Sequence, residues 1–96
     1  MELPEDVAPF IAIRFAKQDV PEARNLLSAA TVEAHGQSPA RLIRCAVFAA
    51  QGRIDEFRYY AQLMAVDLRD VIVAGEFDFH GEELVQVRDL NGPLRV

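Results

Sequence analysis

The chain has 96 residues and 51% of them are hydrophobic, so it can bury one core and is not a disordered protein. Charged residues interrupt every apolar run before the ~18 residues that a membrane span needs, and the acidic first residues lack the basic start of a secretion signal. A formal net charge of −5 argues against nucleic acid or an anionic membrane as the main partner. We therefore expect a cytoplasmic protein that does not associate with membranes.

Capping residues mark two helices in the first third of the chain. Asp6 is the expected N-cap of the first helix, which runs to about Lys17. Asp19 is expected to cap the second helix, with Glu22 reaching back as in a capping box. Gly36 supplies the left-handed residue that ends this second helix.

The helix predicted over Pro39–Gln51 is the centre of the chain, because it is apolar on most of its circumference. Ser38 caps it, and proline follows at the first helical position, where its missing N–H costs nothing. The polar residues Arg41 and Arg44 fall in one narrow stripe that also contains Phe48. Other elements must therefore pack round this helix.

A fourth helix follows after a short loop at Gly52, with Asp55 as its expected N-cap, so the third and fourth helices form an antiparallel hairpin. The fourth helix carries two apolar stripes on nearly opposite sides. The first stripe comprises Phe57, Tyr60, Ala61, Met64 and Leu68, and the second comprises Tyr59, Leu63 and Val66. Such a helix contacts either two neighbours within the domain or one neighbour and a partner.

Asp67 is expected to cap a fifth helix that ends at Gly75. The β-branched run Val71–Val73 could form a strand, but the cap that precedes it favours a helix. Residues 76–80 then alternate between polar and apolar, and residues 84–87 are β-prone. A small β-hairpin is therefore possible, provided that it packs on the helices.

These elements predict a mainly α fold in which about five helices pack as antiparallel hairpins, as a helical bundle or a short α-solenoid. Residues 1–75 form the predicted helical-hairpin domain. Residues 76–96 form a C-terminal tail, extended or folded as a β-hairpin, which packs on this domain or extends from it.

The first two helical hairpins are alike in sequence. The segment Phe15–Arg24 matches Phe48–Arg58 with one residue inserted, after which Glu22 matches Glu56 at an offset of 34 residues. Paired helices with this period resemble the tetratricopeptide repeat, and the resemblance covers roughly residues 8–70. Any stack of helical hairpins, including a compact orthogonal bundle, would show the same capped and short-looped organisation.

In the tetratricopeptide family, small and large residues alternate along the two helices so that they pack closely. The resemblance implies such packing in the first copy for Ala8, Ile11, Ala12, Phe15, Ala23, Leu27 and Ala30. In the second copy it implies the same for Cys45, Phe48 and Ala61. The second copy departs from the family at Arg41 and Arg44, which replace apolar residues, and at Phe57, which replaces a small one.

Residue types that carry catalysis are sparse in this chain. It has no glycine-rich phosphate loop and no paired cysteines, and the single Cys45 is expected to be a small buried hydrophobe. Ser28 and Ser38 have structural interpretations, within a helix and at a cap, while His35 and His80 stand apart from any nucleophile. We therefore expect no enzymatic activity and no cofactor.

One cluster near the C-terminus has the residue types that bind metals. On a strand, Glu76, Asp78 and His80 would share a face, with Glu82 and Glu83 nearby. A solvated acidic strand face explains the same residues. We favour that explanation and expect no bound metal.

Two sets of residues are candidate partner-binding sites. Phe48 between the guanidinium groups of Arg41 and Arg44 would have the composition of an interface hot spot. Alternatively, Phe48 packs under the C-terminal tail and both arginines pair with carboxylates of the tail. The second set, Tyr59, Leu63 and Val66, could form an isologous patch in a two-fold dimer, unless the tail covers it.

The leading hypothesis is a non-enzymatic helical module that binds a protein partner, which could be a second copy of the chain. A second hypothesis is a regulatory DNA-binding or transcription-associated protein, because short-loop helices with Arg41, Arg44 and Arg58 can imitate a helix-turn-helix. Net charge opposes this second hypothesis. A third is an accessory subunit of an enzyme complex whose partner carries the chemistry.

Overall fold

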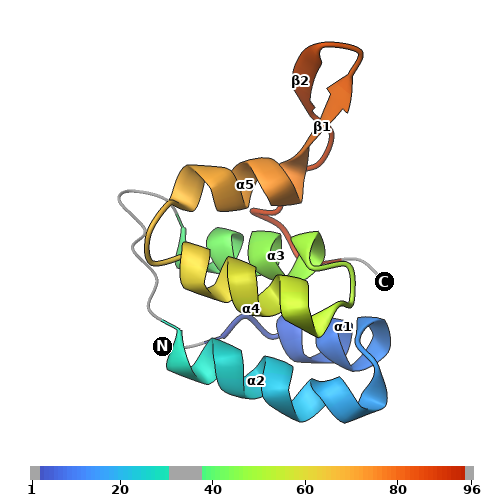
Figure 1. The fold of residues 1–96 in the computed structure, drawn as a ribbon, viewed down its shortest axis with the longest axis vertical. Helices are drawn as coiled ribbons and strands as arrows, with labels where there is room; N and C mark the ends of the chain where they lie inside the picture. Colours follow the sequence, from blue (N-terminus) through green and yellow to red (C-terminus); the bar gives the residue numbers. More distant parts are fainter. Residues whose placement is uncertain (1–2, 31–37, 95–96) are drawn as a thin grey trace.

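The computed structural model describes residues 3–30 and 38–94, and it confirms a mainly α fold of five helices followed by a short β-hairpin (Figure 1). The elements are α1 (Val7–Arg14), a 3-10 turn η1 (Lys17–Asp19), α2 (Val20–Ala29), α3 (Pro39–Ala49), α4 (Ile54–Leu63), α5 (Leu68–Glu76), β1 (Phe77–His80) and β2 (Glu83–Gln86). No helix in these described ranges combines the length and apolar character that crossing a membrane requires.

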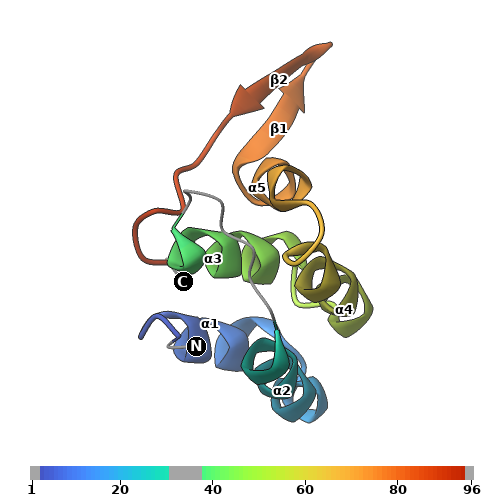
Figure 2. The same ribbon diagram turned by 90° about the vertical axis from the view of Figure 1, so that its left-hand side faces the viewer.

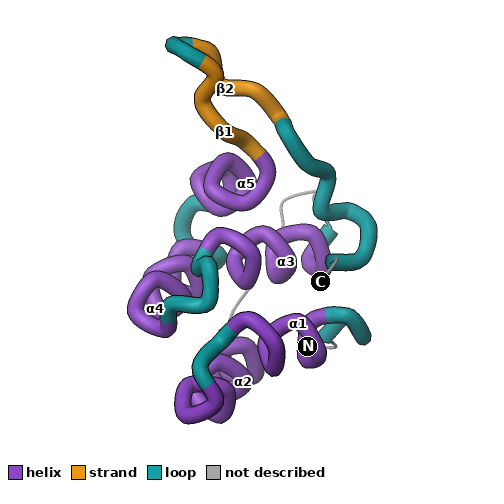
Figure 3. The backbone as a smooth tube through the Cα atoms, turned by 90° about the vertical axis from the view of Figure 1, so that its right-hand side faces the viewer, coloured by secondary structure: helices purple, strands orange, loops and turns teal. Residues whose placement is uncertain are grey.

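The helices lie in three tiers, with α1 and α2 in one, α3 and α4 in the next, and α5 above them (Figure 2). The β-hairpin projects from the end of α5, away from the helices (Figure 3). After β2 the chain turns back as a segment without helix or strand, residues 87–94, which includes a turn at residues 90–92 and reaches α3 and the start of α1. We call these residues the C-terminal strap.

The third helix is the centre of the fold, as its apolar sequence predicts. Its buried residues are Leu42, Ile43, Cys45, Ala46 and Val47. Their neighbours come from every tier, because the single core cluster joins residues of all five helices to Leu90 and Leu94 of the strap. The predicted cap is confirmed, since Ser38 Oγ accepts a hydrogen bond from the Arg41 N–H at 3.4 Å.

The fifth helix confirms a second predicted cap. The Asp67 side chain accepts a hydrogen bond from the Asp70 N–H at 3.4 Å, and the β-branched run Val71–Val73 is helical. However, Gly75 does not end this helix, which continues to Glu76. A Cβ atom on Gly75 would lie 2.6 Å from the Cα of Cys45, so glycine serves close packing of α5 on α3 instead of a C-cap.

Three predicted side-chain caps are wrong, because the carboxylates have other partners or positions. Asp6 and Asp19 stand at the N-cap positions of their helices but make no side-chain cap. Asp6 instead binds Arg44, and the expected capping-box residue Glu22 binds Arg58 of α4. Asp55 lies inside the first turn of α4, whose N-cap position is held by Arg53.

The first helix ends at Arg14, three residues before the predicted end. Phe15 takes an extended conformation that puts its ring in the core, 5.5 Å from the ring of Phe57. The chain then makes the 3-10 turn Lys17–Asp19 before α2 begins. Helix α2 ends at Ala29, earlier than predicted, because Ala30 takes an extended conformation. Gly36, the predicted end, lies outside the described residues.

The loop between α3 and α4 depends on glycine at position 52. Gln51 and Gly52 both have positive φ, at 54° and 76°. A Cβ atom on Gly52 would also collide with the carbonyl oxygen of Arg14, so this loop packs directly against the end of α1. The short connection therefore fixes the α3–α4 hairpin against the first tier.

Of the two conformations left open for the tail, extended or β-hairpin, the structure has a β-hairpin, with Phe77 opposite Gln86 and Phe79 opposite Leu84. Its two-residue loop begins with Gly81, whose φ of 68° suits the first position of a tight hairpin turn. The cross-strand pair Phe79 and Leu84 is exposed to solvent. Contacts at the base of the hairpin, described below, connect it to the helices.

Candidate interaction surfaces

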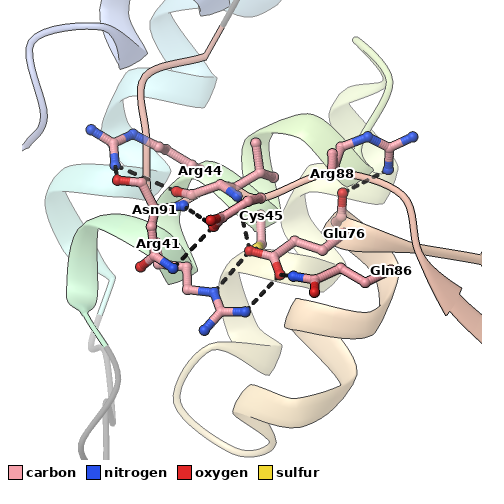
Figure 4. A network of polar contacts seen from close by, with 10 residues as sticks. Arg41, Arg44, Cys45, Glu76, Gln86, Arg88 and Asn91 are labelled. Carbon is pink, nitrogen blue, oxygen red and sulfur yellow. Dashed lines mark hydrogen bonds and ion pairs between the residues drawn. The ribbon is translucent and has the colours of Figure 1, made fainter.

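The carboxylate of Glu76 is fully buried and is the centre of a polar network between α3, α5 and the tail (Figure 4). Its Oε1 accepts hydrogen bonds from Arg41 Nη2 at 2.6 Å and from Gln86 Nε2 at 2.8 Å. Its Oε2 accepts from Arg41 Nε at 2.8 Å and from the Leu90 N–H at 3.0 Å. One carboxylate thus joins a helix, a strand and the strap.

The environment of Glu76 keeps its carboxylate ionised. Burial acts to raise the pKa of this carboxyl, but the hydrogen bonds from Arg41, the Leu90 N–H and Gln86 outweigh burial and lower it. The neighbouring Cys45 thiol shifts the other way: burial and then the Glu76 charge raise its pKa to about 12. Cys45 is buried, as predicted, and its thiol stays protonated near neutral pH, with Sγ 3.8 Å from Glu76 Oε2.

Asp6 is a second carboxylate that binds the strap. It pairs with Arg44 through Nε at 3.1 Å and Nη2 at 3.0 Å, and it accepts the Leu94 N–H at 2.9 Å. Arg44 also donates from Nη1 to the carbonyl oxygen of Asn91 at 2.8 Å. Burial raises the pKa of Asp6, but the bonds from Arg44 and the Leu94 N–H outweigh it, so the pKa is lowered.

The predicted site residues Arg41 and Arg44 therefore pair with Glu76 and Asp6. Of these two carboxylates, only Glu76 belongs to the predicted tail; Asp6 precedes α1. Phe48 is half-buried, and the cation that lies on its ring is Arg88 of the strap, with its guanidinium carbon 4.3 Å from the ring centroid. Part of the tail thus lies over Phe48, as one of the two interpretations expected.

Phe48 also contacts the first tier. Its ring centroid is 6.4 Å from that of Phe10, and the guanidinium carbon of Arg14 lies 5.2 Å from the Phe10 ring. The two rings thus lie between two arginines, in the order Arg14, Phe10, Phe48 and Arg88. These four side chains come from α1, α3 and the strap. Because they are far apart in the sequence, local patterns did not predict that they lie close together.

Two hollows border Phe48. One, of about 60 Å³, is lined by Phe10, Arg14, Phe48, Gln51 and Gly52. The other, of about 310 Å³, is lined by Phe48, Arg88, Asp89, Leu90, Pro93 and Leu94. We call the four side chains described above, together with these two hollows, the Phe48 groove.

The second predicted set, Tyr59, Leu63 and Val66, forms an exposed apolar surface that we call the α4 stripe. Tyr59 is 55% exposed and Val66 is 83% exposed, whereas Leu63 is half-buried. With Gln62, these residues line a shallow hollow of about 160 Å³. The described part of the tail does not cover the stripe, because the lining residues all belong to α4 and the turn that follows it.

A larger hollow lies beside the stripe, between α2 and α4. It measures about 330 Å³ and is lined by Leu26, Ala29, Ala30, Ala61, Gln62 and Ala65. Gln62 borders both this hollow and the α4 stripe. The outer side of the α2–α4 pair therefore presents two adjacent depressions that no charged side chain lines.

The acidic cluster near the C-terminus is arranged differently from the strand face that the sequence suggested. Glu76 ends a helix and is buried, whereas Asp78, His80, Glu82 and Glu83 are exposed on the hairpin. Over residues 3–30 and 38–94, no three His, Cys, Asp or Glu side chains are grouped as a metal site. Ser28 Oγ donates to the Arg24 carbonyl oxygen, as a structural interpretation expects.

One interpretation of the sequence paired Arg41 and Arg44 with carboxylates of the tail, but sequence reasoning identified neither Glu76 nor Asp6 as the partner, nor Arg88 as the cation on Phe48. A carboxylate one residue before an apolar helix resembles an N-cap, and an acidic residue before an alternating segment resembles a strand residue. The feature of the sequence that points to these contacts is the presence of Arg41 and Arg44 on an otherwise apolar helix. Half-buried arginines need carboxylate partners, so such a helix predicts carboxylates from elsewhere in the chain.

Comparisons of this chain with protein-family models, curated proteins and solved structures found no match. The resemblance to the tetratricopeptide repeat therefore stays a prediction.

Proposed function

We propose that this chain is a non-enzymatic protein-interaction module that self-associates through the α4 stripe as a two-fold dimer. The observation that carries this proposal is the exposure of Tyr59 and Val66 on one side of α4, next to the hollow between α2 and α4. Exposed apolar side chains grouped on one surface are typical of protein-binding sites. A single patch that meets its own copy satisfies two-fold symmetry.

The charge distribution allows a second copy to be the occupant. The chain has a net charge of −5, so two copies repel each other unless they meet where charge is absent. The side chains that line the α4 stripe and the adjacent hollow are all uncharged. Two stripes can therefore face each other without like charges opposing across the interface.

The arginines that could imitate a DNA-binding helix have carboxylate partners. Arg41 and Arg44 pair with Glu76 and Asp6. Arg58 forms a two-point ion pair with Glu22. Binding a phosphate would require each guanidinium to leave its carboxylate, which supports the protein-binding proposal over the DNA-binding alternative.

Light scattering coupled to size exclusion, with samples from low to high micromolar concentration, tests the dimer. We expect the wild-type mass to approach that of two chains at high concentration. Val66→Asp should give one chain at every concentration, because it puts two like charges at the contact. Ile13→Asp, which adds the same charge at an exposed position on α1, should leave the dimer intact. A wild-type chain that stays monomeric at high micromolar concentration contradicts self-association.

A further inference from the structure

The hairpin of β1 and β2 stands away from the helices and is held at its base (Figures 2 and 3). There the carbonyl oxygen of Glu76 accepts hydrogen bonds from the Val87 N–H at 2.8 Å and from the Arg88 N–H at 3.2 Å. Within the part of the chain that the structure describes, no backbone hydrogen bond joins residues 78–86 to another element. Both outer edges of this two-stranded sheet are therefore open.

The ladder shows which backbone groups β2 presents on its outer edge. In antiparallel strands, opposite residues alternate between pairs that exchange two N–H···O bonds and pairs that exchange none. Because the Val87 N–H bonds to the Glu76 carbonyl oxygen, the pair that these two residues form is of the first kind. Counting back along β2, Gln86 and Leu84 then belong to pairs of the second kind. Their N–H and C=O groups therefore point outward, where a third strand would bond to them.

The side chains along this edge alternate in character. Leu84 is 43% exposed and lies opposite Phe79, which is 72% exposed, so the two form an apolar pair on one face of the hairpin. Glu83 precedes Leu84 and is exposed on the other face, because successive strand residues point to opposite sides. A third strand beside β2 would therefore place its residues next to an apolar pair and a carboxylate in turn.

The hairpin carries carboxylates but no strong base, since residues 77–87 contain Asp78, Glu82 and Glu83 and neither lysine nor arginine. Asp78 pairs with Arg88 at 3.4 Å. Glu82 and Glu83 are exposed, and neither forms an ion pair with any residue that the structure describes. This holds also for His80, which lies opposite Glu83 in the ladder. Two carboxylates at the tip and on the outer strand are thus left for a partner's cations.

This charge favours one kind of occupant. A second copy would bring the Glu82 and Glu83 carboxylates of both chains to the same sheet, and charged edge residues oppose pairing with an edge of the same charge. A partner strand with lysine or arginine opposite Glu83 is attracted instead. The Phe48 groove shows no such imbalance, because carboxylates accompany its two guanidinium groups.

We infer that the outer edge of β2 binds an extended basic segment of a partner protein, which adds a third, antiparallel strand with lysine or arginine opposite Glu83 and an apolar residue opposite Leu84. In strand addition, main-chain hydrogen bonds provide affinity and alternate side chains provide specificity. Antiparallel pairing is the more stable of the two orientations per residue. The inference takes from the proposed function only that the chain binds proteins, and it concerns a different surface from the α4 stripe.

The probe is a short fluorescein-labelled peptide in which lysine and valine alternate. One matched peptide has glutamate in place of lysine, and another has the same lysines and valines in two blocks, so that charge is kept and alternation is lost. Fluorescence anisotropy at low salt should detect binding of the alternating peptide, weaker binding of the block peptide and none of the acidic peptide, and added salt should weaken binding. No binding of the alternating peptide at millimolar protein, or equal binding of the two basic peptides, overturns the inference.

Methylation of the peptide nitrogen atoms tests strand addition directly. In the proposed register each valine lies opposite Leu84 or Gln86 and bonds to it, whereas the lysine N–H groups point away from β2. Methylation at the valines should therefore abolish binding, and methylation at the lysines should leave it. The same effect from both methylations would show that the peptide does not pair with β2 in this way, and it overturns the inference.

Protein variants then locate the site. Glu83→Gln should weaken binding of the alternating peptide about fivefold, as loss of one exposed ion pair does. Glu5→Gln removes the same charge at an exposed position before α1 and should not change the affinity. Leu84→Thr should also weaken binding, because it reduces the apolar pair but keeps a residue that favours strands. Circular dichroism confirms that each variant folds. Equal losses from Glu83→Gln and Glu5→Gln would indicate a general charge effect and overturn the assigned site.

The two proposals can fail separately. Val66→Asp acts on the α4 stripe and should leave the peptide affinity unchanged, whereas Glu83→Gln should leave the mass of the wild-type assembly unchanged. A dimeric chain that does not bind the alternating peptide overturns only strand addition at β2. A monomeric chain that still binds this peptide overturns only self-association.

Discussion

The strap side of α3 and the outer side of α4 contain the same chemical pair in different surroundings. On the strap side, Arg41 binds Glu76, whose side chain is 0% exposed. On the outer side, Arg58 binds Glu22 with the same two-point geometry, but the two side chains are 50% and 41% exposed. Burial, and not the identity of the partners, separates the two pairs.

The consequences of this difference extend beyond the pairs themselves. Glu76 also accepts the Leu90 N–H and the Gln86 amide, so the buried pair holds the strap and the base of the hairpin in place. The exposed pair joins α2 to α4 and leaves the adjacent α4 stripe uncovered. One side of the α3–α4 hairpin is thus closed by the chain itself, and the other is open to solvent.

We expect Glu76→Gln to have the largest effect, a loss of about 3 kcal/mol in the free energy of unfolding measured by urea denaturation. The amide removes the charge that faces Arg41 and directs a donor toward groups that already donate to this position. The control is Glu83→Gln, which makes the same change at an exposed hairpin position and should be neutral. Similar losses in the two variants would contradict the special role of the buried carboxylate.

Gly75→Ala tests the close packing beside that carboxylate and should cost about 2 kcal/mol. In an exposed helix the same change stabilises by up to about 1 kcal/mol, so the sign of the result is informative. Here the new methyl group would lie 2.6 Å from Cys45 Cα and force α5 away from α3. Gly92→Ala is the matched control, because a Cβ there meets nothing within 4 Å. A stabilised Gly75→Ala protein would show that the helices adjust without strain.

Lowering the pH acts on the strap side more gently than substitution, because only part of the carboxyl population is protonated. The folded pKa values of Glu76 and Asp6 lie below their ordinary values of 4.5 and 3.8. Their contribution to stability is therefore fully present above those ordinary values and is lost as pH falls through the lower folded values. We expect the melting temperature to fall between about pH 5 and pH 3. The Glu76→Gln variant should show a shallower fall over the same range, and an identical fall would assign the effect to other groups.

The sequence predicted the parts of this comparison that depend on local pattern. Ser38 and Asp67 cap helices as expected, because a side chain that satisfies an amide three residues ahead needs no distant partner. The exposed stripe of Tyr59 and Val66 also followed from helical periodicity alone. The open side of the molecule was thus visible in the sequence.

The closed side was only one of two interpretations of the sequence, and its pairs were not identified, because they join residues far apart in the chain. Asp6 and Arg44 are 38 residues apart, and Arg41 and Glu76 are 35 residues apart. Local patterns predicted that Asp6 caps a helix and that Gly75 ends one. In the structure Asp6 makes no side-chain cap, and Gly75 is required for the close packing of α5 on α3. Phe48 was expected either between Arg41 and Arg44 or under the tail; the tail does lie over it, and the cation on its ring is Arg88. Only tertiary structure brings these groups together.

The smallest effect should come from the exposed pair. We expect Glu22→Gln, Arg58→Gln and the double variant to unfold at the same urea midpoint as the wild type, within error. Both side chains of this pair are about half exposed, so water and salt screen their attraction. Their double-mutant cycle should give a coupling free energy near zero, and salt should not change it further. The corresponding cycle of Arg41→Gln and Glu76→Gln should give a clear coupling, because Glu76 is buried. Equal coupling free energies in the two cycles would show that burial does not distinguish the closed side from the open one. The two-point geometry that both pairs share would then explain the coupling in each.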